Sequence, residues 1–203
     1  MITRDSDVRA ALMKNVISDH IANPDTLVVE ELGLNRGSCR VDVAVVNGLL
    51  HGYEIKSDAD TLSRLPSQVI SYSAVLDKAT LVVGASHTMR ALSLIPDWWG
   101  VRIVKTGARG AVLIEPLRPA RMNDGIDATA LALLLWRDEL VDALASLGVE
   151  KSRLRAPRAQ LAQTLAEVLP LKRLRPLVRE RVKNRTGWRC YGLRQQHDER
   201  LLP

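Results

Sequence analysis

Aromatic side chains are scarce in this sequence of 203 residues, which contains four Trp, three Tyr and no Phe. A core must therefore be built from Leu, Val, Ile and Ala, and a hydrophobic fraction of 46% is enough for one. No apolar run approaches the roughly 18 to 20 residues that a membrane span requires. The first ten residues, MITRDSDVRA, also lack the apolar stretch of a signal peptide. We therefore expect a cytoplasmic protein with no membrane partner.

Cysteine and histidine are sparse as well. Cys39 and Cys190 lie far apart in the sequence without a CxxC spacing, and the four His residues form no HxxxH pattern. These spacings argue against a structural zinc site and against catalysis by a Cys/His pair. Neither GxSxG nor GxxxxGK[ST] occurs, which argues against a serine hydrolase and a P-loop NTPase.

Positive charge is concentrated in the last two fifths of the chain. Residues 1–117 carry 12 of the 29 Lys and Arg residues and 13 of the 23 Asp and Glu residues, a net charge of −1. Residues 118–203 therefore carry 17 basic and 10 acidic residues, a net charge of +7. Such an asymmetry favours a polyanionic partner, usually nucleic acid. A soluble Arg-rich helical segment is the alternative.

The first part of the sequence predicts an α/β fold with the element order α-β-β-β-α-β and a further hairpin appended. A helix is expected over 5–21, capped by Asp5 or Ser6, and a second one, with Pro66 in its first turn, ends near residue 76. The strands are expected at 27–34, 40–46, 49–57, 79–85, 101–106 and 111–116.

The sequence from residue 127 onward has the pattern of amphipathic helices. One is expected over 128–148, a second over 156–170 and a strongly basic third over 172–185. The segment RPARMNDGID resembles a linker, so we expect a core domain of residues 1–117 and a helical, basic C-terminal subdomain of residues 118–203.

Charged residues interrupt the central strands. Because side chains alternate along a strand, Glu54 and Lys56 must point to the same face. A partly buried charge in a sheet must be paired or bind a metal. With Asp42 on the preceding strand, two carboxylates would provide the hard oxygen ligands that suit Mg²⁺ or Mn²⁺.

The Asn47-Gly48 turn decides whether Asp42 joins this face. A two-residue loop would put Asp42 and Glu54 on opposite faces. A three-residue loop, Val46 to Gly48 with Gly48 in a left-handed bulge, would place Asp42 opposite Gly52 and beside Glu54. We predict the three-residue loop, or an equivalent bulge, since only an odd length assembles the site.

The series Glu31, Asp42 and Glu54-x-Lys56 resembles the PD-(D/E)XK nuclease superfamily, and Gln68-x-x-x-Tyr72 is similar to the QxxxY motif of its RecB-like branch. The stretch ELGLNRGSCRVDVAVVNGLLHGYEIKSDADTLSRLPSQVISYSAVLDKATLVVG resembles a bacterial and prophage-borne family placed in that superfamily. The resemblance implies a restriction-endonuclease-like core. It also implies metal binding by Asp42 and Glu54 and a role for Lys56 toward the attacking water. Glu31 would be a further acidic residue; Val41 replaces the usual Pro.

Gln68 and Tyr72 lie one helical turn apart, and Arg64 extends the same stripe. They would hold a nucleotide beside the metal, unless they form an ordinary polar helix face. Ser57 is a further candidate contact, although Ser57 and Asp60 also fit a turn cap. The predicted nucleic-acid contacts are Arg40, Ser57, Arg64, Lys172, Arg173, Arg175, Arg179, Arg181, Lys183 and Arg185.

The function expected from these patterns is a metal-dependent nuclease that hydrolyses phosphodiester bonds in DNA. The alternative is a DNA-binding or regulatory protein without catalysis on the same fold. A helix-turn-helix regulator formed by residues 157–189 is a weaker third reading, because Pro170 suits that turn poorly. A homodimer is left open.

Overall fold

A single six-stranded mixed sheet forms the centre of the computed structural model, which describes residues 2–34 and 37–186. The strands follow one another across the sheet in sequence order. They are β1 (Leu27–Leu34), β2 (Cys39–Val46), β3 (Leu50–Lys56), β4 (Lys78–Gly84), β5 (Gly100–Thr106) and β6 (Val112–Arg118). β4 is parallel to both β3 and β5, and the remaining neighbours are antiparallel. The predicted mixed α/β class is confirmed, and the last hairpin continues the main sheet.

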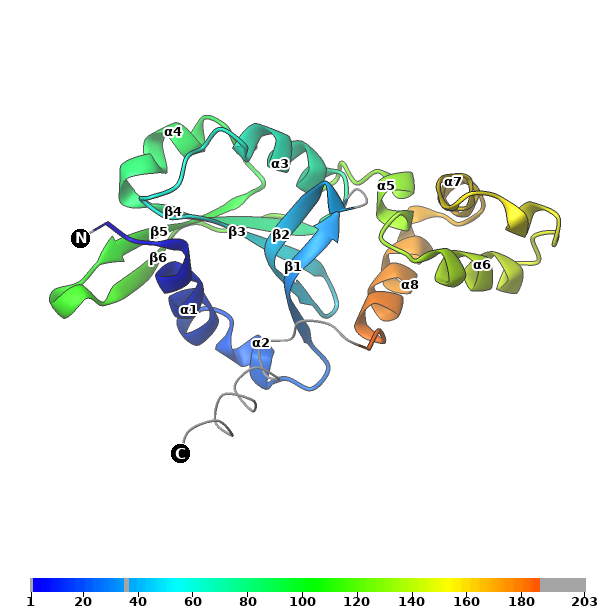
Figure 1. Ribbon diagram of the computed structural model, residues 1–203, viewed down its shortest axis with the longest axis horizontal. Helices are drawn as coiled ribbons and strands as arrows, with labels where there is room; N and C mark the ends of the chain where they lie inside the picture. The colour runs from blue at the N-terminus through cyan, green and yellow to red at the C-terminus, as the bar shows by residue number, and fades with distance from the viewer. Residues whose placement is uncertain (1, 35–36, 187–203) are drawn as a thin grey trace.

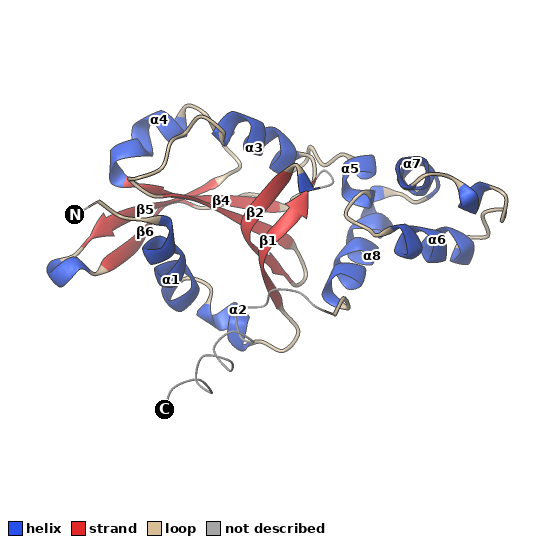
Figure 2. Ribbon diagram, viewed as in Figure 1, coloured by secondary structure: helices blue, strands red, loops and turns tan. Residues whose placement is uncertain are grey.

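Helices cover both faces of the sheet and extend beyond one side of it. They are α1 (Asp5–Asn15), α2 (Ser18–Ala22), α3 (Leu65–Ser73), α4 (Thr88–Leu92), α5 (Ala128–Ala132), α6 (Arg137–Ser146), α7 (Arg158–Val168) and α8 (Leu171–Lys183). α3 and α4 lie on one face and α1 on the other, while α5 to α8 gather beside the β1–β2 side (Figures 1 and 2). None of the helices in the described residues is long and apolar enough to cross a membrane.

Two helices expected as continuous are interrupted. The first ends at Asn15, because the Ile17 N–H bonds to the Leu12 carbonyl five residues back, which widens the last turn. Its N-cap is Arg4 and no side chain caps it, so the predicted caps at Asp5 and Ser6 are wrong.

The helix expected over 128–148 divides into α5 and α6. Asp127 caps α5 by accepting the Ala130 N–H at 2.7 Å, and the Glu139 carboxylate accepts the Trp136 N–H at 2.7 Å where α6 begins. The intervening bend allows Leu135 to be fully buried. As predicted, Gly148 follows the second helix, with the positive φ of 78° that glycine adopts readily.

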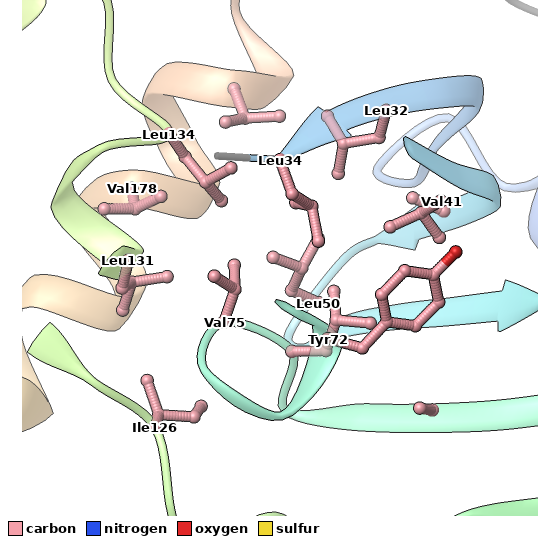
Figure 3. Packing of buried hydrophobic residues seen from close by; sticks show 14 of the residues in the cluster. Leu32, Leu34, Val41, Leu50, Tyr72, Val75, Ile126, Leu131, Leu134 and Val178 are labelled. Atoms are coloured by element: carbon pink, nitrogen blue, oxygen red, sulfur yellow. The ribbon is translucent and has the colours of Figure 1, made fainter. Parts of the chain in front are cut away.

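The hydrophobic core is divided by the sheet into two clusters. Under α1, the smaller cluster joins Val8 and Leu12 to Val43 and Ile55 of the sheet. On the α3 face, the larger cluster runs without interruption from the sheet into α5 to α8. Figure 3 shows Leu34 and Val75 from the first part of the chain beside Leu134 and Val178 from the second. The C-terminal helices therefore share their core with the sheet.

The hairpin between β2 and β3 has the odd loop length that the site requires, but the predicted position is wrong by one residue. Val46 pairs with Leu50, so the loop comprises residues 47–49. The Asn47 side chain accepts the Leu49 N–H at 3.0 Å, and Gly48 has no positive φ, contrary to the predicted left-handed bulge. Continued along the strands, this register places Asp42 directly opposite Glu54 instead of Gly52.

Strands β1 and β2 both turn over at the end of the sheet that carries Asp42. On β1, Val29 and Leu32 both belong to the larger apolar cluster, on the α3 face of the sheet. In a regular strand, two side chains three residues apart would point to opposite faces. Glu31, between them, has a φ of 56°. Ala44 and Val41 on β2 repeat this pattern. The two strands thus reverse their faces together, at Glu31 and Asp42.

Candidate active site

A cleft of about 620 Å³ lies where the ends of β1, β2 and β3 meet the start of α3. Its polar lining contains seven of the predicted site residues. These are Glu31, Arg40, Asp42, Glu54, Lys56, Arg64 and Gln68. The odd number of residues in the β2–β3 loop and the reversal of faces in β1 and β2 bring together residues that are up to 37 positions apart in the sequence.

Glu54 and Lys56 share the α3 face of β3, as strand alternation predicted. The Glu54 side chain is fully buried and the Lys56 side chain is 6% exposed. The Lys56 ammonium donates a hydrogen bond to Oε1 of Glu54, so the two charges compensate one another inside the protein.

Gln68 and Tyr72 both contact Glu54, and Gln68 also lines the cleft, while their predicted role toward a nucleotide remains a prediction. Nε2 of Gln68 donates to Oε1 of Glu54 at 2.6 Å. The buried Tyr72 hydroxyl donates to Oε2 of Glu54, and its oxygen lies 2.8 Å from the Arg40 carbonyl oxygen. Burial, with the charge of Glu54 beside it, raises the pKa of the Tyr72 hydroxyl. Tyr72 therefore remains a hydrogen-bond donor that orients the carboxylate.

Asp42 stands at the point where β2 reverses its faces, and its side chain reaches the backbone of β3. Its Oδ2 accepts the Ile55 N–H at 2.7 Å, which ties β2 to β3 where the regular pairing ends. Burial and the negative charge of Glu54 raise the pKa of the Asp42 carboxyl to about 7. Two carboxylates that repel one another in a partly buried position provide a place for a cation.

Arg9 of α1 is a site residue that the sequence analysis missed. Its guanidinium donates to the Asp42 carbonyl at 2.9 Å and lies 3.6 Å from Oδ1 of Asp42. It also contacts Asp5 at 3.2 Å and Glu30 at 3.9 Å. In the sequence, Arg9 looks like half of an exposed i,i+4 pair with Asp5, because nothing there shows that α1 packs behind β2.

Glu31 occupies the mouth of the cleft. Its carboxylate is 3.2 Å from Arg40, and the two side chains are 44% and 63% exposed. The adjacent Glu30 is buried and lies toward Arg9, away from the partly exposed carboxylate of Glu31. The role of Glu31 in a metal site remains a prediction.

Ser57 does not face the cleft, although we predicted a nucleic-acid contact for it. It is buried, and both its backbone N–H and its hydroxyl donate to Oδ2 of Asp60, at 2.8 and 2.6 Å. The turn-capping alternative therefore describes Ser57.

Most of the basic residues of α8 have intramolecular partners. Arg175 and Arg179 lie 3.5 and 3.1 Å from Asp77, and Arg181 lies 3.9 Å from Asp142. Lys183, the last residue of α8, bonds to the Asp25 carbonyl. Arg185, two residues beyond α8, bonds to Glu139 at 2.6 Å and lies over the Trp136 ring.

Arg185 is only 5% exposed, so its guanidinium serves the packing of α6 against α8. Lys172 and Arg173 are exposed at the start of α8. The predicted contact between these basic residues and nucleic acid remains a prediction. The predicted subdomain and the helix-turn-helix reading, which extends to residue 189, reach past 186 and so lie partly outside the described residues.

The donor chemistry of the cleft fits a hard divalent cation. Five carboxylate residues but only three cationic residues line it: Asp5, Glu31, Asp42, Glu54 and Asp60 against Arg40, Lys56 and Arg64. Oε2 of Glu54 accepts from the Tyr72 hydroxyl, and a carboxylate oxygen can accept two such hydrogen bonds. Across the described residues, no group of three or more His, Cys, Asp or Glu side chains is arranged to hold a metal. A cation bound between Asp42 and Glu54 would therefore need further oxygen ligands, which backbone carbonyls or water can supply.

A mixed α/β protein with a charged cleft at the end of its sheet is the class that the fold and the site define. The family model described as bacteriophage P4 protein cII matches residues 2–199, and the chain belongs to this family. It is 26% identical to protein cII of Enterobacteria phage P4 over 184 residues, which are 91% of this chain and 68% of that protein. A solved protein of unknown function from Silicibacter pomeroyi is similar with a TM-score of 0.45 and 20% identity, covering 77% of this chain and 94% of that one.

Proposed function

We propose that the protein is a metal-dependent nuclease with a restriction-endonuclease-like core that hydrolyses phosphodiester bonds in DNA. The observation that carries this proposal is the convergence of Asp42, Glu54 and Lys56 in one cleft. It depends on the odd loop of the β2–β3 hairpin, which places the two carboxylates opposite one another.

Asp42 and Glu54 would hold Mg²⁺ or Mn²⁺, whose chemistry would be to acidify a bound water and offset charge on the phosphate. The acidic excess in the cleft lining supports this requirement, since a phosphodiester would otherwise be repelled. Gln68 and Tyr72 fix the orientation of Glu54, and Arg9 fixes Asp42.

Lys56 would stabilise negative charge on the attacking oxygen or on the phosphate. In the hydrolysis, the water oxygen bonds to phosphorus and gives up a proton to the solvent, the bond from phosphorus to the leaving deoxyribose oxygen breaks, and that oxygen takes up a proton from the solvent. Arg40 and Arg64 at the mouth of the cleft are exposed enough to contact neighbouring phosphates.

The test is cleavage of supercoiled plasmid, linear duplex, single-stranded DNA and RNA with Mg²⁺, Mn²⁺ or EDTA. We expect metal-dependent cleavage that Asp42→Asn and Lys56→Ala each reduce by about 100-fold or more. Asp97→Asn is the matched control, because Asp97 is 92% exposed and distant in sequence from the cleft residues. Cleavage that persists in the Asp42 and Lys56 variants, or in EDTA, would show a contaminating nuclease.

A non-catalytic nucleic-acid-binding protein on the same fold is the second candidate. The observation that favours it is that the Glu54 oxygens already contact three side chains of the protein, Lys56, Gln68 and Tyr72. Salt-sensitive DNA binding without cleavage of any of these substrates, with either metal, would favour this function.

A further inference from the structure

A second pocket, of about 360 Å³, lies on the other face of the sheet. Its floor is formed by neighbouring residues of β3, β4 and β5, since His51 pairs with Lys78, Tyr53 with Thr80, and Thr80 with Gly100. The complete lining is His51, Tyr53, Lys78, Thr80, Arg102 and residues 116–120. Because His51 and Tyr53 alternate with Gly52 and Glu54 along β3, this pocket and the candidate active site open on opposite sides.

All the charged side chains that line this pocket are basic. Lys78, Arg102 and Arg118 line it, and no Asp or Glu does. Arg118 is held by the Trp99 carbonyl at 2.8 Å and lies 3.3 Å from Asp97. Within the described part of the chain, neither Lys78 nor Arg102 forms an ion pair with a carboxylate. Two partly exposed cations thus converge on a cavity without a counter-charge.

The centre of the pocket is fixed in position. The His51 ring stacks on Tyr53 at 4.4 Å between centroids, and its Nε2 lies 2.9 Å from Oγ1 of the buried Thr80. A Cβ at Gly100 would lie 2.8 Å from the same Oγ1, so only glycine leaves room there. Burial and the positive charges of Lys78, His20 and Arg102 lower the pKa of His51 to about 3.

We propose that this pocket is a binding site for a phosphate group. A guanidinium and an ammonium on neighbouring strands supply the forked and the point-charge donors by which proteins hold phosphate. The volume is that of a small-ligand pocket, so it admits a phosphate with an attached sugar. The source is either the backbone of a nucleic-acid strand or a free phosphate compound. The site stands apart from the proposed nuclease centre and does not require it.

The experiment measures binding to the full chain without divalent cations, by calorimetry and by NMR of the His51 ring. The probes are inorganic phosphate, a nucleoside monophosphate and a short single-stranded oligonucleotide. The test variant is Lys78→Gln with Arg102→Gln. The matched control, Arg90→Gln with Lys105→Gln, removes one Arg and one Lys from exposed positions outside the pocket.

We expect the test variant to bind the phosphate probes about tenfold more weakly, and the control less than about twofold. An equal loss for the oligonucleotide assigns the pocket to a strand backbone. A loss for phosphate and the monophosphate alone assigns it to a free phosphate compound. Arg102→Gln by itself replaces the double variant if that variant unfolds.

Affinities that change equally in the test and control variants, or phosphate titration that leaves the His51 resonances unmoved, would overturn the proposal. The two proposals fail separately. Asp42→Asn should leave phosphate binding in this pocket intact, and a protein without nuclease activity can still show the predicted loss in the Lys78 and Arg102 variant.

Discussion

Arg9 and Glu31 are the single residues whose structural roles exceed their appearance in the sequence. Arg9 lies among Asp5, Glu30 and Asp42, so one guanidinium compensates three carboxylates. Glu31 has a left-handed backbone, a conformation that costs a non-glycine residue about 1 kcal/mol or more. Both residues lie where β1 and β2 reverse their faces: Glu31 is part of β1 there, and Arg9 binds Asp42 of β2.

Arg9→Gln should lower the free energy of unfolding by about 1 to 3 kcal/mol, because it removes the hydrogen bond to the Asp42 carbonyl and the positive charge beside the Asp42 and Glu30 carboxylates. The measurement is urea denaturation. Lys14→Gln on the exposed side of the same helix is the control and should change stability by less than about 0.5 kcal/mol. Equal effects of the two substitutions would contradict the role given to Arg9.

At position 31, glycine should be more stable than alanine by about 1 kcal/mol, because only glycine adopts a φ of 56° without steric cost. The reverse order is expected at Glu115, a half-exposed position of β6, where glycine weakens a strand. Denaturant midpoints of the four variants give the comparison. Alanine equal to or better than glycine at position 31 would show that the backbone there is unstrained.

The β2–β3 hairpin is the element on which the candidate site depends. Its register sets Asp42 opposite Glu54, and a change of one residue in the loop would move every side chain of one strand to the other face. Gly52 helps to hold this register. A Cβ on it would lie 2.5 Å from Cδ1 of Leu76 and 2.9 Å from Cγ1 of Val41.

Gly52→Ala should therefore destabilise the protein by about 1 to 3 kcal/mol, through overpacking between β3 and the segment after α3. Gly48→Ala in the loop of the same hairpin is the matched control, since nothing lies within 4 Å of its added Cβ. Thermal or urea unfolding measures both. A Gly52 variant as stable as the Gly48 variant would mean that Leu76 moves aside freely.

A continuous apolar cluster joins the sheet to the C-terminal helices, so we expect the two parts to unfold together. Asp77 adds a polar connection between the two parts. This buried carboxylate accepts the Leu50 N–H at 2.8 Å and lies beside Arg175 and Arg179 of α8. The backbone carbonyl of Asp77 also accepts the Asn123 N–H at 2.9 Å, which fixes the segment that leads to α5.

Asp77→Asn should lower the free energy of unfolding by about 3 kcal/mol, since it leaves two partly buried guanidinium groups without their counter-charge. Asp97→Asn, which breaks an exposed ion pair with Arg118, should cost less than about 0.5 kcal/mol. Denaturation followed by circular dichroism measures both, and the transition should remain single. Separate transitions for the sheet and the helices would contradict a shared core.

Local patterns in the sequence were enough to predict most elements of the fold and part of the site. Strand alternation placed Glu54 and Lys56 on one face, and the Asn47-Gly48 signal identified the hairpin. These features depend on neighbouring residues, whose geometry the backbone fixes without help from the rest of the chain. The nuclease activity and the metal remain predictions.

Tertiary packing decided the rest, because it brings together groups that the sequence keeps apart. The turnover of β1 and β2 at Glu31 and Asp42, and the approach of Arg9 from α1, depend on which helix covers which face. Gln68 and Tyr72 share the expected stripe of α3, and the packing of α3 brings both of them into contact with Glu54, a partner that their spacing did not indicate. Local periodicity states which side of an element is polar, whereas only the packed neighbour determines what that side binds.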